Sequence, residues 1–152
     1  MENKIQNTEL LMDIFGKFPN FHDAEVVKTA LKRKENDEYC PILETSVLIK
    51  HYGLGDSFLV NFKFKSIFGL KLENFNRQNV LGSLEIQEFD DEYFESLKSD
   101  KRLRGVTTRQ EVEGLNFYVR FNYCFGIEAE FLCESIVIES VKLLSPEEIK
   151  LL

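Results

Sequence analysis

The sequence predicts a single α+β domain, residues 1–152, built on a curved and mainly antiparallel sheet. Two observations predict this fold class. Apolar and polar residues alternate in most segments, which is typical of strands that bury one face. Helical spacing of apolar residues occurs in two short segments, one near the N-terminus and one in mid-chain. A chain of this length can bury one substantial core without a metal or a disulfide.

The clearest strand signal lies between residues 57 and 65. Four apolar residues in this segment share one parity, and mostly polar residues occupy the other. The segment that begins at Phe117 repeats the pattern, so both apolar faces are expected to meet in one core. The residues expected to face that core are Phe58, Val60, Phe62, Phe64, Phe117, Val119 and Phe121.

The first third of the chain is expected to contain a helix and a hairpin. Residues 8–15 carry apolar residues at helical spacing, and Gly16 suits a left-handed C-cap. Pro19 prevents the helix from continuing. Residues 24–34 fit either a helix or a strand, and we interpret them as a strand because the β-branched segment 41–49 can pair with them across a polar turn.

The middle of the chain alternates apolar and polar segments. An apolar segment at 67–72 and a strand at 80–86 flank a run of amide side chains. Residues 90–104 are expected to form a short surface helix, because acidic residues at its start and basic residues at its end complement the helix dipole. The polar segment 105–114 is expected to be a mobile loop.

Two further strands are expected at 117–123 and 127–131, with a bend at Gly126 between them. The apolar parity then changes, which predicts a bulge or a tight turn near residues 134–135. The last residues, 147–152, are expected to form one loose turn.

Composition excludes several classes of protein. A net charge of −7 opposes the phosphate neutralisation that drives nucleic-acid binding. The three cysteines are an odd number without CxxC spacing, and no apolar leader precedes them, so reduced thiols in a cytoplasmic protein are expected. No apolar run approaches the ~20 residues that cross a bilayer. Neither a nucleic acid nor a membrane is therefore an expected partner.

The sequence contains little recognisable chemistry. His22 and Asp23 resemble the adjacent ligands of metal-dependent phosphohydrolases, but the chain has only one other histidine, His51. A catalytic metal site needs more ligands than these, so no metal is expected and the pair is interpreted as structural. No phosphate-binding loop, zinc-protease motif or nucleophile elbow occurs. No catalytic residue and no cofactor are predicted.

The amide cluster Asn74, Asn76, Gln78 and Asn79 is the most unusual polar feature. Amide side chains both donate and accept hydrogen bonds, so the cluster can satisfy a buried loop or recognise a partner. The sequence leaves both roles open.

Two motifs, Phe21–Val26 and Leu72–Val80, resemble the immunity protein 50 family of bacterial polymorphic toxin systems. Gly126–Glu128 and Cys133 extend the resemblance over roughly residues 19–143. The chain differs from the family pattern in lacking a Trp before the first motif and in having a more acidic middle segment. The matching motif residues are Phe21, His22, Asp23, Glu25, Phe75, Asn76, Gln78 and Asn79.

This resemblance implies a cytoplasmic immunity protein that binds and neutralises a cognate toxin domain without catalysis. The alternative is a small-molecule-binding protein or an enzyme with one pocket around His22, Asp23, Glu25 and the cluster of Asn76, Gln78 and Asn79.

A dense acidic segment is the expected partner-binding surface, because carboxylates can steer encounter with a basic toxin surface. Two aromatic residues within it are expected to add apolar contacts. The residues of this surface are Glu85, Glu88, Asp90, Asp91, Glu92, Tyr93, Phe94 and Glu95.

Overall fold

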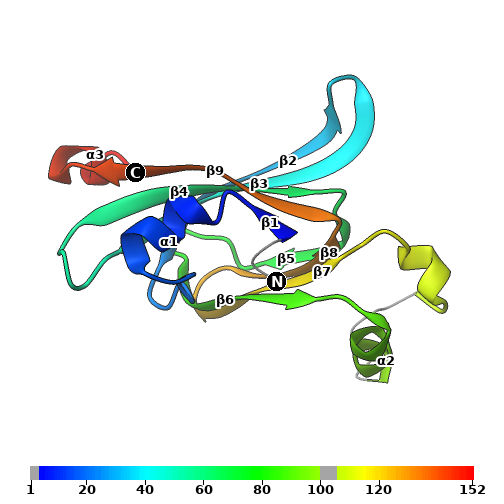
Figure 1. Ribbon diagram of the computed structural model, residues 1–152. Coiled ribbons are helices and arrows are strands. Elements are labelled where there is room, and N and C mark those ends of the chain that lie inside the picture. Colours follow the sequence, from blue (N-terminus) through cyan, green and yellow to red (C-terminus); the bar gives the residue numbers. More distant parts are fainter. Residues whose placement is uncertain (1–3, 100–105) are drawn as a thin grey trace.

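The structure is a computed structural model that describes residues 4–99 and 106–152 (Figure 1). Its strands form one nine-stranded sheet in the order β1-β9-β4-β3-β2-β6-β7-β8-β5. The strands are β1 (Ile5–Gln6), β2 (Glu25–Glu35), β3 (Glu38–Lys50), β4 (Ser57–Lys65), β5 (Phe68–Glu73), β6 (Val80–Glu88), β7 (Phe117–Phe125), β8 (Glu128–Cys133) and β9 (Ser135–Leu144). Only β1, which pairs with β9, is parallel to its neighbour in this sheet.

Three short α-helices accompany the sheet in the described part of the chain: α1 (Glu9–Phe15), α2 (Asp91–Ser99) and α3 (Pro146–Lys150). One large sheet with short helices agrees with the α+β expectation, and the helices near the N-terminus and in mid-chain lie where they were expected. The end of the predicted second helix, with its basic residues 101–104, lies outside the described residues. No helix within the described ranges is both long and apolar enough to cross a bilayer.

Two segments are more ordered than the sequence predicts. The segment expected to be a mobile loop contains a 3-10 helix, η2 (Arg109–Val112), with a capping box between Thr108 and Glu111. The tail forms a helix, α3, because Ser145 accepts the backbone N–H of Glu148 and Pro146 suits the first turn.

The expected hairpin is confirmed, since β2 and β3 pair along almost their whole length. Asn36 and Asp37 form its turn, and both have positive φ, 51° and 65°. Asn and Asp tolerate this conformation better than other non-glycine residues.

The sheet bends where β4 continues into β5 and β8 continues into β9. Lys65 pairs with Ser135 before the bend, and Phe68 pairs with Leu132 after it. At the bend, the Ser66 hydroxyl donates to the Glu134 carboxylate at 2.7 Å. The irregularity expected near residues 134–135 is thus confirmed, and it turns one half of the sheet over the other (Figure 1).

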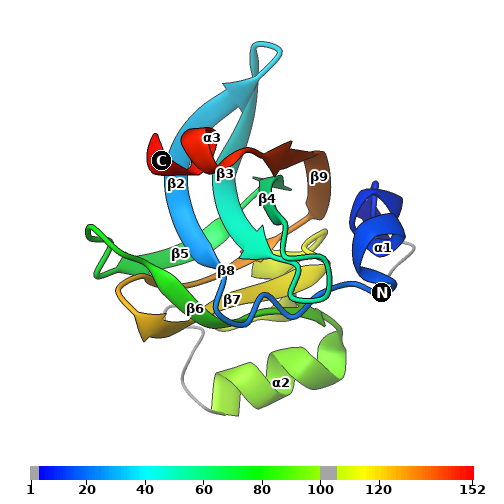
Figure 2. The same cartoon turned by 90° about the vertical axis from the view of Figure 1, so that its left-hand side faces the viewer.

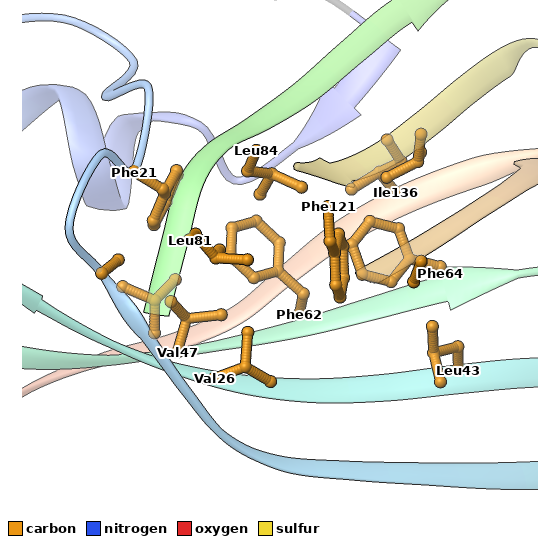
Figure 3. Packing of buried hydrophobic residues seen from close by; sticks show 14 of the residues in the cluster. Phe21, Val26, Leu43, Val47, Phe62, Phe64, Leu81, Leu84, Phe121 and Ile136 are labelled. Carbon is orange, nitrogen blue, oxygen red and sulfur yellow. The ribbon is translucent and has the colours of Figure 1, made fainter. Parts of the chain in front are cut away.

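The core fills the space between β2, β3, β4 and β9 on one side and β5 to β8 on the other. Every residue expected to face it from β4 and β7 is at most 7% exposed. The rings of Phe64 and Phe131 meet edge to face with centroids 5.0 Å apart. Figure 3 shows Phe62, Phe64 and Phe121 lying between strands of the two halves.

A second, smaller apolar cluster lies on the outer face of β7 and β8. There α2 and η2 cover Tyr118 and Leu132 with Phe94, Leu97 and Val112. In Figure 2 α2 runs beneath β6 and β7. The cluster therefore fixes the position of the acidic segment against the sheet.

Candidate functional site

The two motif segments meet at one end of the sheet. Asp23 donates its backbone N–H to the carbonyl of Leu81 at 3.0 Å, and Leu81 donates to the carbonyl of Ala24 at 2.8 Å. Val26 then donates to the carbonyl of Asn79 at 2.8 Å. These bonds join the first motif to the start of β6, immediately after the amide cluster.

We call the place where these segments meet the junction. The side chain of Asn79 stabilises it by hydrogen bonds. Its side chain is buried, and its Oδ1 accepts the backbone N–H of Asn76 at 2.9 Å and that of Ile127 at 3.2 Å. Its Nδ2 donates to the carbonyl of Asn76 at 2.8 Å. Because one amide satisfies three backbone groups, Asn79 serves the loop and not an external ligand.

The third family segment joins the same junction through Gly126, whose φ is +90°. A Cβ at this position would lie 2.3 Å from the carbonyl oxygen of Gln78 and 2.8 Å from Oδ1 of Asn79. Both the backbone conformation and the close approach therefore require glycine.

The residues of the first motif divide into buried and exposed ones. Phe21 is fully buried, and its ring packs against Phe62 at a centroid distance of 5.5 Å. The His22 imidazole is exposed, with Nδ1 3.1 Å from the Asp23 carboxylate. Among the described residues, no group of three or more His, Cys, Asp or Glu side chains is arranged to hold a metal ion.

A hollow of about 260 Å³ joins parts of both motifs. Glu25, Asn76 and Asn79 line it together with apolar side chains of β2, β3 and α3. His22 lines a different hollow of about 290 Å³, beside Phe21 and His51. The alternative interpretation requires a single pocket shared by His22, Glu25 and the amide cluster. The structure instead places His22 at one hollow and Glu25, Asn76 and Asn79 at another.

Exposed aromatic side chains surround the junction, and sequence reasoning missed two of them. Phe75 is 46% exposed, Tyr123 61% and Phe125 57%. Tyr123 and Phe125 lie near the amide cluster because β7 pairs with the start of β6 at Leu81 and Val80. Alternation along β7 suggests a buried Tyr123, but the register of β7 against β6 shifts at this end.

The structure alters the predicted partner-binding surface in two respects, of which the first concerns its aromatic residues. Phe94 is 3% exposed and belongs to the apolar cluster under α2, so it cannot supply the expected surface contact. Tyr93 is half-buried, with its ring 5.6 Å from that of Tyr118.

Several of the predicted carboxylates already have partners within the chain. Asp90 accepts the backbone N–H of Tyr93 at 2.8 Å and so caps α2. Asp91 pairs with Arg109 at 3.1 Å, and Glu88 lies 3.7 Å from Lys4. The exposed carboxylates of the predicted surface that neither cap α2 nor form an ion pair with another described residue are Glu85, Glu92 and Glu95.

Comparison with known proteins gave one match. The model of the immunity protein 50 family matches residues 7–144. This range contains all three motif segments of the junction and the acidic segment. No curated protein and no solved structure matches the chain.

Proposed function

The chain belongs to the immunity protein 50 family, and on this premise we propose that it binds a cognate protein toxin and neutralises it without catalysing a reaction. The family match over nearly the whole chain is the observation that carries the proposal. In this role the protein contributes a rigid surface that complements the toxin.

The arrangement of the junction supports this proposal, because its buried motif residues maintain the fold. Phe21, Asn79 and Gly126 maintain the backbone by burial, hydrogen bonding and close approach. Motif residues with such roles preserve the scaffold. Recognition of a toxin then rests on exposed side chains around the scaffold.

We place toxin binding on an acidic surface made of Glu85, Glu92 and Glu95. Their carboxylates are exposed, and α2, which carries two of them, is packed firmly on the sheet through Phe94 and Leu97. A rigid array of like charges attracts an oppositely charged partner and accelerates encounter. The surface suits a toxin with a basic face, such as one that acts on nucleic acid.

Co-expression tests this proposal. A candidate toxin domain, taken from the genes that neighbour the gene of this chain, should arrest bacterial growth when it is expressed alone, and co-expression of the chain should restore growth. A variant with Gly126→Ala, which disrupts the junction, should restore growth less well and should be found at a lower soluble level. Arrested growth in the presence of abundant soluble wild-type chain would contradict the proposal.

A further inference from the structure

One edge of β2 is open over most of its length. β2 pairs with β3 on one side, but its pairing with β6 on the other side is confined to Glu25 and Val80. The bond from Val26 N–H to the carbonyl of Asn79 is the last on that side. From Val27 to Glu35 this edge has no strand partner among residues 4–99 and 106–152. In Figure 2 the β2–β3 hairpin projects beyond the rest of the sheet.

The open edge is strongly basic. Lys28, Lys32, Arg33 and Lys34 are all exposed. Lys32 bonds to Glu44 at 2.6 Å, whereas the other three cations form no ion pair within the described part of the chain. Glu35, at the end of the strand, is already bound to Lys63 and Lys65. The edge therefore presents backbone groups without a strand partner beside three cations that form no ion pair with a described residue.

Exposed apolar side chains lie on the same hairpin. Leu31 is 63% exposed although it pairs across the hairpin with the buried Leu43. Tyr39 is 74% exposed and lies opposite Lys34. A strand placed against β2 would cover Leu31 and gain apolar contact in addition to backbone hydrogen bonds.

We propose that the open edge of β2, residues 27–35, binds an extended acidic segment of a partner protein, which adds to the sheet as a further strand. Backbone N–H and C=O groups of β2 supply the hydrogen bonds, and Lys28, Arg33 and Lys34 select carboxylates. This inference does not depend on which toxin the chain neutralises, because it concerns a surface remote from α2 (Figure 2).

Charge decides between the possible occupants of the edge. A second copy of β2 would set one row of Lys and Arg against another, and like charges on adjacent strands are destabilising. A nucleic acid would satisfy the cations, but its phosphates have no hydrogen-bond donors and would leave the strand's carbonyl groups without partners. An acidic peptide satisfies both the charges and the backbone groups.

The test uses the isotope-labelled chain and a nine-residue peptide of alternating glutamate and valine. We expect saturable amide shift changes centred on residues 27–35, together with slower amide exchange of β2. The same peptide with alternate backbone amides N-methylated should not bind, because it cannot form the strand ladder. Equal binding of the methylated peptide, or tighter binding of a thymidine oligonucleotide, would overturn the proposal.

A matched pair of variants tests the role of charge. Lys28→Glu, Arg33→Glu and Lys34→Glu together should weaken peptide binding about tenfold or more. The control variant Lys17→Glu, Lys50→Glu and Lys71→Glu makes the same change in net charge at other exposed sites and should retain binding within about twofold. If the basic residues merely prevent self-association of the edge, the wild type will bind no peptide, and the proposal fails.

Discussion

The side-chain oxygen of Asn79 accepts the backbone N–H of Ile127 at 3.2 Å, although 48 residues separate the two along the chain. This bond connects the amide cluster with the turn between β7 and β8. It assigns a structural role to Asn79, which the sequence left open between scaffold and binding. Asn76 and Gln78 remain exposed at the same junction.

Replacing Asn79 with alanine should destabilise the fold by about 2 to 4 kcal/mol, because the N–H groups of Asn76 and Ile127 lose their acceptor. Gln78→Ala is the matched control, since this side chain is exposed, and it should change stability by less than about 0.5 kcal/mol. Urea denaturation of both variants measures the difference. Equal stabilities would refute the structural role of Asn79.

Thr45 offers a stabilising substitution. It is 2% exposed, and its hydroxyl has no hydrogen-bond partner in the described part of the chain. Thr45→Val removes this buried polar group and should raise the unfolding free energy by about 1 kcal/mol. Val47→Thr, on the same face of β3, should lower it by a similar amount. A destabilised Thr45→Val variant would show that the hydroxyl has a partner in solution.

Glu35 should make stability depend on pH. Hydrogen bonds from Lys65, and then from Lys63, hold the pKa of its carboxyl below the usual 4.5. A pKa that is lower in the folded state gives stability above the unfolded pKa, and this stability is lost as pH falls through the folded value.

Glu35→Gln should therefore lower Tm at neutral pH and flatten the fall in Tm below pH 4.5. The control is Glu38→Gln, an exposed carboxylate of the same hairpin without an ion pair to a described residue. Thermal melts between neutral and acidic pH compare the two variants. Parallel curves for wild type and Glu35→Gln would exclude the effect.

The acidic surface should increase the rate at which the chain associates with the toxin. Glu85→Lys, Glu92→Lys and Glu95→Lys together should slow association with the toxin about tenfold or more at low salt and leave the dissociation rate less affected. These positions are chosen because Asp90 and Asp91 already act within the fold. Stopped-flow rates across a series of salt concentrations measure the effect.

The control for this variant is Glu38→Lys, Glu73→Lys and Glu147→Lys, which alters net charge equally at exposed sites away from α2. It should retain a rate close to that of the wild type at moderate salt, where distant charges are screened. Identical rates and salt slopes for both triple variants would exclude the acidic surface and direct attention to the junction.

Local sequence patterns predicted much of the sheet. Alternation placed Phe62 and Phe121 in the core correctly, and the polar turn at Asn36 and Asp37 defined the first hairpin. Two capping boxes, at Thr108 and Ser145, were visible as Thr or Ser followed by Glu three residues later. They could have indicated η2 and α3.

Other features depend on contacts between distant segments. The three-way junction at Asn79 joins residues far apart in the chain, which periodicity cannot reveal. The open edge of β2 follows from the divergence of β2 and β6 after Val26. The burial of Phe94, in contrast, could have been predicted from the sequence, because Phe94 and Leu97 lie three residues apart on one face of a helix.

The stoichiometry of neutralisation tests the central claim most directly. Purified chain is titrated into a fixed amount of a toxin domain against which the chain protects in the co-expression experiment, while toxin activity is measured. Binding without catalysis requires activity to fall linearly and to vanish at a fixed molar ratio of chain to toxin, whatever the incubation time. Loss of activity at far smaller amounts of chain, progressing with time, would show that the chain acts as an enzyme and would contradict the account.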